Sequence, residues 1–266
     1  MNLQASCDFD YSGRTVLVTG GTAGIGRAIA NAYKAAGADV HVTGRKERLS
    51  DYGADLAGFG YFPMTANDEG DIAAIVERLP SLDILVNNAG ESHPGGYDRR
   101  YEPDVFEQTV EIILFGPYRL ASALRPTLAR SAMPGGASVV NLASMSSFFG
   151  MDAVPGYGAA KAAIVQLTKT LAIAWTPDNI RVNAIAPGNT RTRIFDRVID
   201  VPEALEPLMA RTPMGRFGEP EEMAGPTLFL TSPHASFITG QTLSVCGGFS
   251  IACRMRVRPT LLQNPT

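Results

Sequence analysis

Two side chains spaced four residues apart have the chemistry needed to move a proton. Tyr157 and Lys161 have this spacing, which on a helix places both on one face, about one turn apart. A lysine ammonium near a phenol favours the phenolate, so it should lower the tyrosine pKa toward the range useful for acid–base catalysis. Ser144 ends a predicted strand, where its hydroxyl can hold a carbonyl oxygen while Tyr157 exchanges the proton. Alone, such a pair is usually a surface coincidence, so its meaning depends on its surroundings.

A glycine-rich run has the pattern of a dinucleotide-binding turn. Gly20, Gly24 and Gly26 follow an apolar run at 15–19 directly, and a helical pattern starts among them. Glycines permit a sharp turn and a close approach of backbone to a pyrophosphate, and a helix N-terminus supplies free N–H groups. The position between a first strand and a first helix therefore predicts nucleotide binding rather than a simple tight turn.

The end of the second predicted strand bears on which cofactor is bound. A carboxylate there holds a ribose 2′-hydroxyl, whereas a cation holds a 2′-phosphate. The residues present are Thr43, Gly44, Arg45 and Lys46, with no carboxylate. Cations at a helix start oppose the helix dipole, which argues against a merely solvated helix start. We therefore expect NADP(H) to be preferred, with NAD(H) possible.

These residues depend on a regular alternation of strands and helices. Short apolar runs predict strands at 15–19, 39–43, 59–64, 82–86, 137–142, 180–185 and 242–245. Helical spacing predicts helices at 25–36, 45–57, 68–79, 103–131, 155–175, 202–211 and 220–230. Gly53 weakens the second helix, and Pro117 predicts a kink in the fourth. The alternation predicts an α/β fold, a doubly wound, Rossmann-like parallel sheet of about seven strands with helices on both faces.

Composition narrows the class of protein. The chain has 266 residues, is 45% hydrophobic and 18% charged, and has a formal net charge of −3. This suits one domain, expected over 1–252, followed by a loose tail at 253–266. The charge balance gives no footprint for nucleic acid, and no apolar run is long enough for a membrane span. Few scattered cysteines and histidines and no visible secretory signal predict a cytoplasmic protein without a metal site.

Together these patterns resemble the short-chain dehydrogenase/reductase family over about residues 10–252. The matching runs are TGGTAGIG (19–26), NNAG (87–90), NLAS (141–144), YGAAK (157–161), RVNAIAPG (181–188) and GQTLSVCGG (240–248). The resemblance implies an NAD(P)(H)-dependent oxidoreductase that transfers a hydride between the nicotinamide and a ketone or secondary alcohol. It also implies a homotetramer or homodimer, with the helices at 103–131 and 155–175 at an interface.

The resemblance also implies roles for individual residues. Tyr157 is expected to be the general acid/base, Lys161 to lower its pKa and hold the nicotinamide ribose, and Ser144 to orient the substrate oxygen. A substrate lid is expected at 193–216, with loops at 91–101 and 145–154 completing the pocket. The expected cofactor contacts are Gly20, Thr22, Gly24, Ile25, Gly26, Arg45, Asn87, Ala89, Gly90, Tyr157, Lys161, Pro187, Gly188, Thr190 and Thr192.

Three positions depart from the family pattern. Ile113 replaces an asparagine that serves a proton relay, and an isoleucine side chain cannot hydrogen-bond water. Thr65 replaces an aspartate that contacts adenine, and Ala23 replaces a basic residue of the glycine turn in NADP-preferring members. Arg45 is therefore the main argument for a 2′-phosphate.

Two other functions stay open at this point. One is a 3-oxoacyl-thioester reductase acting on acyl carrier protein or coenzyme A substrates. That reaction calls for cations near the pocket mouth, and the candidates are Arg99, Arg100, Arg191 and Arg193. The other is a dinucleotide-binding sensor or scaffold with little or no catalysis.

Overall fold

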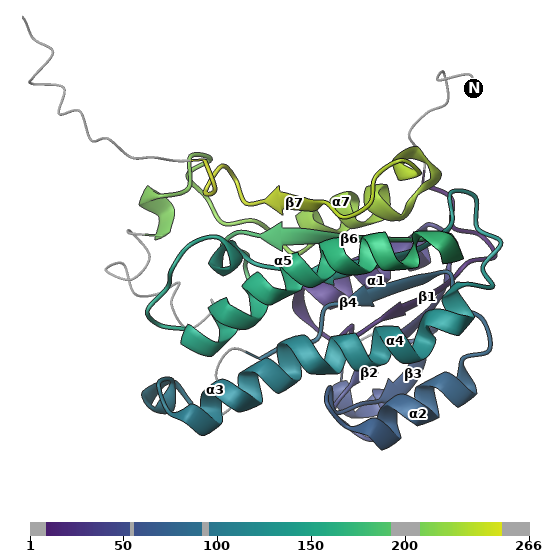
Figure 1. Cartoon of the computed structure of the whole chain (residues 1–266), viewed down its shortest axis with the longest axis horizontal. Helices are drawn as coiled ribbons and strands as arrows, with labels where there is room; N and C mark the ends of the chain where they lie inside the picture. The colour runs from purple at the N-terminus through teal and green to yellow at the C-terminus, as the bar shows by residue number, and fades with distance from the viewer. Residues whose placement is uncertain (1–8, 54–55, 92–95, 193–207, 252–266) are drawn as a thin grey trace, which may run out of the picture.

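The strands of the protein form one parallel sheet. The computed structural model describes residues 9–53, 56–91, 96–192 and 208–251. Within them a seven-stranded sheet has the order β3-β2-β1-β4-β5-β6-β7, and every neighbouring pair is parallel (Figure 1). The strands are β1 (Thr15–Val18), β2 (Asp39–Gly44), β3 (Gly60–Pro63), β4 (Ile84–Asn87), β5 (Ala137–Leu142), β6 (Ile180–Pro187) and β7 (Thr242–Val245). The predicted doubly wound α/β architecture is confirmed.

Helices cover both faces of this sheet. They are α1 (Gly24–Ala35), α2 (Glu69–Arg78), α3 (Pro103–Val110), α4 (Gly116–Leu128), α5 (Pro155–Trp175) and α7 (Glu221–Thr231). Helix α1 packs with α7 on one face, whereas α2, α4 and α5 lie over the other (Figure 1). All strand arrows point the same way in that view, so the carboxyl ends of the strands share one edge.

Adjacent residues of β1 pack into two hydrophobic cores, one on each face of the sheet. Val16 and Val18 pack in a cluster with Ile29 of α1, whereas Leu17 packs on the opposite face in a cluster with Leu124 of α4. All five are fully buried. Because both faces are covered, the strand is apolar throughout instead of alternating with polar residues.

Two helix predictions were wrong in detail. The described residues of 45–57, which are 45–53 and 56–57, contain no α-helix: a short 3-10 turn, η1 (Leu49–Tyr52), forms there, and Gly53 ends it in the left-handed conformation with φ 61°. The stretch 103–131 is not one kinked helix, because a π-helical segment, η3 (Glu111–Phe115), separates α3 from α4. Pro117 has no N–H for an ordinary helical bond, and the preceding Gly116 N–H reaches back to the Glu111 carbonyl.

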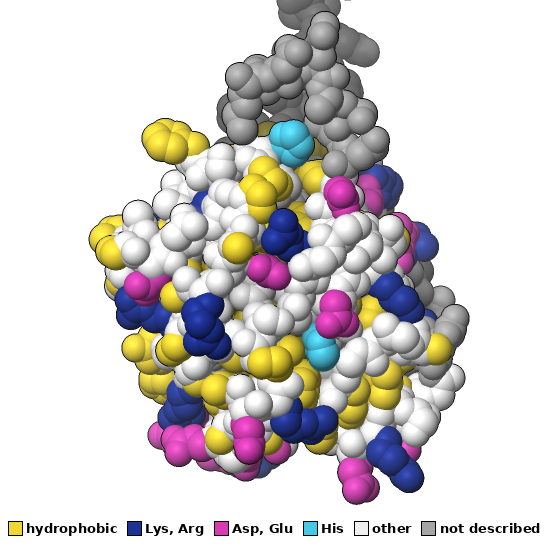
Figure 2. All heavy atoms as spheres, turned by 90° about the vertical axis from the view of Figure 1, so that its right-hand side faces the viewer, with side chains coloured by type: hydrophobic (Ala, Val, Ile, Leu, Met, Phe, Trp, Pro, Cys, Tyr) yellow, Lys and Arg dark blue, Asp and Glu magenta, His cyan; other side chains and the backbone are white. Residues whose placement is uncertain are grey.

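Other sequence predictions fall partly outside the described residues. The helix expected at 202–211 is seen only at 208–210. Most of the expected lid at 193–216 and the whole tail at 253–266 lie outside the described ranges. Among the described residues, no helix has the length and apolarity needed to cross a membrane. On the described part of the face shown in Figure 2, acidic and basic side chains are interspersed without an extended patch of either sign.

A buried arginine ties the end of α7 to the sheet. Arg181 of β6 is 6% exposed, and its guanidinium donates to the carbonyls of Gly135 (2.9 Å), Leu230 (2.6 Å) and Thr231 (3.1 Å). Leu230 and Thr231 belong to the last turn of α7, where carbonyls lack helical partners and the dipole favours a cation. Among the described residues no carboxylate pairs with Arg181. Backbone carbonyls therefore solvate this charge.

We expect Arg181→Met to lower the free energy of unfolding by about 3 kcal/mol, because several buried carbonyls lose a charged donor. Urea denaturation measures the change. The free energy of unfolding of Arg181→Lys should lie between those of Arg181→Met and the parent, since one ammonium cannot reach all the carbonyls to which the planar guanidinium donates. The matched control is Arg130→Met, near the surface, which should change stability by less than about 0.5 kcal/mol. Equal losses at both positions would contradict this account.

Candidate active site

The site begins where the order of the strands reverses. Strands β1 and β4 are neighbours at this point, and open α/β sheets bind ligands at such a position, outside the carboxyl ends of the strands. Gly20, after β1, lies against Ala89, after β4: a Cβ on Gly20 would stand 3.1 Å from the Ala89 Cα. Gly20 also has φ 65°. Both the conformation and the close approach therefore require glycine here.

Polar side chains hold the glycine turn in place. The Asn88 side-chain amide donates to the carbonyls of Thr19 (2.9 Å) and Gly20 (3.3 Å). The Thr19 hydroxyl accepts from the backbone N–H groups of Asn88 (2.9 Å) and Ala89 (3.0 Å). The Gly20 N–H donates to the Thr43 hydroxyl at 3.1 Å. We did not predict Asn88, Thr19 or Thr43 as site residues, although the first two belong to the NNAG and TGGTAGIG runs.

The N-terminus of α1 fits a dinucleotide pyrophosphate. No side chain caps it, and its first turn contains no acidic residue. Its first N–H groups and the positive end of its dipole are thus available to an anion. A Cβ on Gly24 would meet only Thr192, at 3.6 Å from Cγ2, so Thr192 lies over the turn. A Cβ on Gly26 would clash with the Asn88 amide at 2.3 Å, which explains that glycine.

The arginine expected to bind a 2′-phosphate is engaged with a carboxylate. Arg45 follows β2, and its Nη1 lies 3.0 Å from Oε2 of Glu91. The two side chains are 77% and 42% exposed, and an exposed pair of this kind contributes only ~0–1 kcal/mol. An incoming phosphate can therefore replace Glu91. Thr22 lies beside Gly44 at the same strand end, 3.0 Å from where a Gly44 Cβ would stand.

Two of the predicted cofactor contacts have their side chains in the protein interior. The Asn87 amide donates to the Asn141 side chain at 2.9 Å and is buried between β4 and β5. Ile25 packs against the core cluster beneath α1. Any contact of these two with a cofactor must come mainly from their backbone. Gly90 lies against Ile113, which would stand 3.7 Å from a Gly90 Cβ.

The segment after β6 is fixed by its own polar contacts. Pro187 ends the strand, and the Gly188 N–H donates to the Val245 carbonyl at 2.9 Å. A Cβ on Gly188 would stand 2.7 Å from the Cys246 Cα, so the two backbones touch. The buried Thr190 hydroxyl donates to the Gly188 carbonyl at 3.0 Å.

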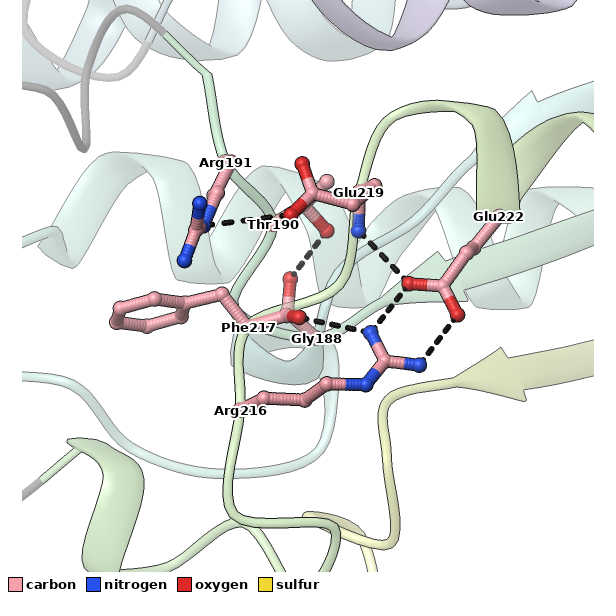
Figure 3. Close-up of polar contacts among 7 residues, drawn as sticks. All are labelled: Gly188, Thr190, Arg191, Arg216, Phe217, Glu219 and Glu222. Carbon is pink, nitrogen blue, oxygen red and sulfur yellow. Dashed lines mark hydrogen bonds and ion pairs between the residues drawn. The ribbon is translucent and has the colours of Figure 1, made fainter.

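One ion pair joins this segment to residues 216–222, and a second braces those residues internally, as Figure 3 shows. Thr190 and Gly218 form an isolated parallel bridge. Arg216 makes two 2.6 Å bonds to the Glu222 carboxylate, and Arg191 lies 3.3 Å from Glu219. Arg216 holds the pKa of Glu222 down to about 2. The Arg216–Glu222 pair therefore stays charged over the physiological range, and the Arg191–Glu219 pair fixes the predicted carboxamide-binding segment against it.

The predicted catalytic side chains converge at the end of β5. Ser144 opens the short turn η4 (Met145–Ser147), and Tyr157 and Lys161 lie one turn apart on α5. A side-chain hydrogen bond links Ser144 to Tyr157, and the Lys161 ammonium stands 5.5 Å from the centre of the Tyr157 ring. Lys161 is 5% exposed and donates to the Leu142 carbonyl.

Burial controls the charge states of this group. The surroundings of the Tyr157 hydroxyl raise its pKa by desolvation, and the hydrogen bond to Ser144 offsets part of that rise. The spacing had predicted a lowered pKa, which is wrong: desolvation is the largest effect on the hydroxyl and raises its pKa, while the Lys161 ammonium lies over the ring. Burial also lowers the pKa of Lys161, from its ordinary value of 10.5 to about 8.

A serine that we did not predict aligns these groups. The Ser147 hydroxyl accepts from the Ser144 N–H (3.2 Å) and donates to the Lys161 carbonyl (2.8 Å). It thereby connects the turn that carries Ser144 to the helix that carries Tyr157. Its signal in the sequence was only a polar Ser-rich run.

The relay position is filled by hydrocarbon. Ile113 lies in η3, is 1% exposed, and packs with Met145 and Ile164 in the cluster that Tyr157 contacts. A separate cavity of about 570 Å³ opens toward β7, lined in part by Gly188, Arg216 and Cys246. Neither Ser144 nor Tyr157 lines it.

Comparison with known proteins identifies the family. A family model described as enoyl-(acyl carrier protein) reductase matches residues 20–250. The 3alpha-hydroxysteroid dehydrogenase of Mediterraneibacter gnavus is 38% identical over 247 residues, which cover 88% of this chain and 96% of that protein. This chain belongs to the short-chain dehydrogenase/reductase family.

Solved structures agree with this membership. A protein described as a short chain dehydrogenase/reductase family protein superposes with a TM-score of 0.80 at 35% identity, over 91% of this chain and 100% of that chain. A putative NAD(P)-dependent gluconate 5-dehydrogenase from Beutenbergia cavernae, with bound NADP, gives 0.81 at 34% identity, over 92% and 100%. As a family member, the chain is an oxidoreductase whose fold and sequence fit NAD(P)(H)-dependent hydride transfer.

The depressed pKa of Lys161 predicts a pH-dependent stability difference. Below pH 8 the lysine is charged in both folded and unfolded chains, and burial of the charge costs about 3 kcal/mol. Above its unfolded pKa of 10.5 the lysine is neutral in both, and the cost vanishes. Lys161→Met should therefore have a higher free energy of unfolding than the parent at pH 7. The gain is at most the cost of burying the charge, reduced by the contribution of the lost hydrogen bond to the Leu142 carbonyl. The gap should close by pH 10.5.

Urea denaturation of both proteins at pH 7 and near pH 10 measures this gap. The comparison of variant with parent removes the contributions of other groups that titrate in alkali. A gap independent of pH would show that Lys161 is not buried as a charge.

Proposed function

We propose that this protein interconverts a ketone and a secondary alcohol with a preference for NADP(H), using Tyr157 as general acid/base. The convergence of Ser144, Tyr157 and Lys161 beside an uncapped helix N-terminus carries the proposal. A protein that only binds nucleotides has no physical need for a phenol and an ammonium desolvated together. That argues against the sensor alternative.

In the reducing direction, the bound cofactor supplies a hydride to the carbonyl carbon. Tyr157 donates its hydroxyl proton to the carbonyl oxygen, while the Ser144 hydroxyl hydrogen-bonds the same oxygen and orients it. The carbonyl thus gains one hydride and one proton and becomes the alcohol. The Lys161 ammonium stabilises the phenolate left on Tyr157, which then regains a proton from solvent. Because Ile113 has no polar side chain, this return passes through water and backbone groups near Lys161.

The arginines suggested for a thioester substrate are partly engaged elsewhere. Arg99 makes two bonds to the Asp104 carboxylate (2.9 and 2.7 Å), and Arg191 pairs with Glu219. Arg100 stacks on the Tyr101 ring, 4.9 Å from its centre. These pairs are exposed like that of Arg45, so an incoming phosphate can replace them too, and the carrier-bound thioester stays the second candidate; relatives include the 3-oxoacyl-[acyl-carrier-protein] reductase FabG of Thermotoga maritima.

We further propose a cytoplasmic homotetramer or homodimer built from one domain over 1–252. Large apolar side chains on the long helices support an interface there. They are Phe106 of α3, Phe115 before α4, Tyr118 of α4 and Ile173 of α5, each more than two-fifths exposed. Apolar groups gathered on exposed helices are typical of subunit contacts.

Substitution of the acid/base should separate chemistry from binding. Tyr157→Phe keeps the ring and removes the proton donor, so turnover should fall by at least ~100-fold while NADPH binding changes by less than twofold. Ketone reduction is followed by loss of nicotinamide absorbance, and binding by fluorescence titration. Phe237→Leu, on a fully exposed side chain between α7 and β7, is the control for general disturbance. A variant with parental turnover would remove Tyr157 from the mechanism.

Cofactor choice should depend on Arg45 and its partner Glu91. Arg45→Ala should weaken NADPH binding about 10-fold or more, since it removes a charged contact to the 2′-phosphate, and leave NADH binding nearly unchanged. Glu91→Gln frees Arg45 from its carboxylate and should tighten NADPH several-fold. Titrations with NADPH, NADH and 2′,5′-ADP measure both effects. If Arg45→Ala weakened both cofactors equally, the argument for the phosphate would fail.

A further inference from the structure

One arginine near the reacting groups is held by aromatic rings instead of by a carboxylate. The Arg211 guanidinium carbon lies 4.5 Å from the centre of the Phe149 ring and 4.3 Å from that of Phe249. The two rings stand edge to face, with centres 6.0 Å apart and planes at 73°. Cation–π contacts of this kind hold the cation without neutralising it.

The two rings come from segments about one hundred residues apart in the sequence that meet near the site. Phe149 follows the Ser144 turn, and its N–H donates to the Met145 carbonyl at 3.1 Å. Phe249 follows β7, and its N–H donates to the Cys246 carbonyl at 3.0 Å. Cys246 in turn touches Gly188, at the expected carboxamide end of the nicotinamide. Arg211 therefore lies between the segment that follows Ser144 and the segment that follows β7.

Tyr157 belongs to the same neighbourhood. It packs, together with Phe149, against the buried cluster that contains Phe249, Met145 and Ile113. These neighbours are apolar, so the surroundings of the reacting hydroxyl offer few polar groups. Binding sites of this kind commonly combine apolar walls with one or two charged anchors that set orientation.

Backbone contacts fix the position of Arg211. The Thr212 N–H donates to the Met209 carbonyl at 3.0 Å, and the Met214 N–H donates to the Gly247 carbonyl at 3.1 Å. Pro213 packs so closely on Gly248 that a Cβ there would stand 2.8 Å from its ring. The segment thus lies tightly on the turn after β7, and Arg211 is not a loose surface side chain.

The hydrogen-bonding capacity of Arg211 is unused within the described part of the chain. There, no ion pair or hydrogen bond involves its guanidinium, whereas nearby Arg191 and Arg216 each pair with a glutamate. Because the two ring planes stand at 73°, the guanidinium can lie flat against one ring at most, and the N–H donors on the edge turned away from the other ring remain available. Their planar arrangement matches a carboxylate with two parallel bonds.

We propose that Arg211 binds a carboxylate of the substrate, so that the enzyme acts on oxo acids and the corresponding hydroxy acids. This inference rests on the proposed ketone–alcohol chemistry and names its substrate class. The carboxylate pairs with Arg211 while the ketone oxygen lies between Ser144 and Tyr157. The low-dielectric aromatic surroundings strengthen the ion pair, and the carboxylate itself is unchanged by the reaction.

The test compares acids with their uncharged analogues. The probes are unbranched oxo acids with the ketone two to five carbons along the chain, each paired with its primary amide. In the parent enzyme we expect the best acid to exceed its amide in kcat/KM by roughly 10- to 100-fold, the worth of a charged hydrogen-bonded pair. Arg211→Met should remove that preference, chiefly through KM for the acid, and leave the amide within about twofold. Arg211→Lys should restore part of it.

Arg125→Met is the matched control. Arg125 also stacks on an aromatic ring, 5.6 Å from the centre of Trp175, but it pairs with Asp178 away from the site. The Arg125→Met variant should show the same preference for acids over amides as the parent. Equal losses for acid and amide in Arg211→Met would show that the arginine only braces its segment, and would overturn the proposal. A parent enzyme without preference for acids would do the same.

A binding measurement separates this inference from the proposed function. Calorimetric titration of the NADPH complex of Tyr157→Phe with each acid and its amide reports carboxylate recognition without turnover. Acid binding that is lost in the double variant with Arg211→Met supports the inference even if no ketone is reduced by the parent. Absence of any difference between acid and amide, with or without Arg211, overturns it while leaving ketone reduction to be judged by turnover alone.

Discussion

The site depends on the close approach of the two segments that follow β1 and β4 at the centre of the sheet. Strands β1 and β4 are neighbours, and the chain leaves them in opposite directions, so a crevice opens at their carboxyl ends. Gly20 and Ala89 come close enough there that a side chain on Gly20 would not fit without adjustment. The Asn88 amide satisfies the carbonyls exposed by this approach, and α1 then starts with its N–H groups directed at the crevice. The cofactor cradle follows from backbone geometry more than from particular side chains.

Desolvation sets the pKa values of the reacting groups. Burial moves the pKa of Tyr157 up and that of Lys161 down, so each is shifted toward its neutral form. An ammonium next to a phenol becomes effective only when a proton leaves the phenol and creates a charge to stabilise. Ser144 and Ser147 keep the distance between the groups constant, because hydrogen bonds join the turn and the helix that carry them. The site is preorganised around a charge that is absent at rest.

Four arginines of this protein have different kinds of partner and therefore different roles. Arg181 is solvated by carbonyls at the end of α7, and Arg216 is neutralised by Glu222. Arg45 is held by an exposed glutamate that a phosphate can displace. Arg211 is held by two aromatic rings, which leave N–H donors on one edge available. The role of each cation therefore depends on what surrounds it, which residue type alone does not reveal.

The sequence by itself determined the fold class and the seven strands in their chain order, and it predicted Ser144, Tyr157 and Lys161 as site residues. Apolar runs too short for helices, glycines directly after the first of them, and the Tyr157–Lys161 spacing are local patterns with local physical causes. Local patterns do not show which distant residues come into contact, and such contacts decide the stability of a helix or the pKa of a side chain. The false helix at 45–57, the π-helical segment before Pro117 and the raised pKa of Tyr157 were therefore missed. Only the tertiary structure placed Glu91 on Arg45, Ser147 between Ser144 and Lys161, and two distant phenylalanines around Arg211, because each of these contacts joins segments whose separation in sequence says nothing of their distance in space.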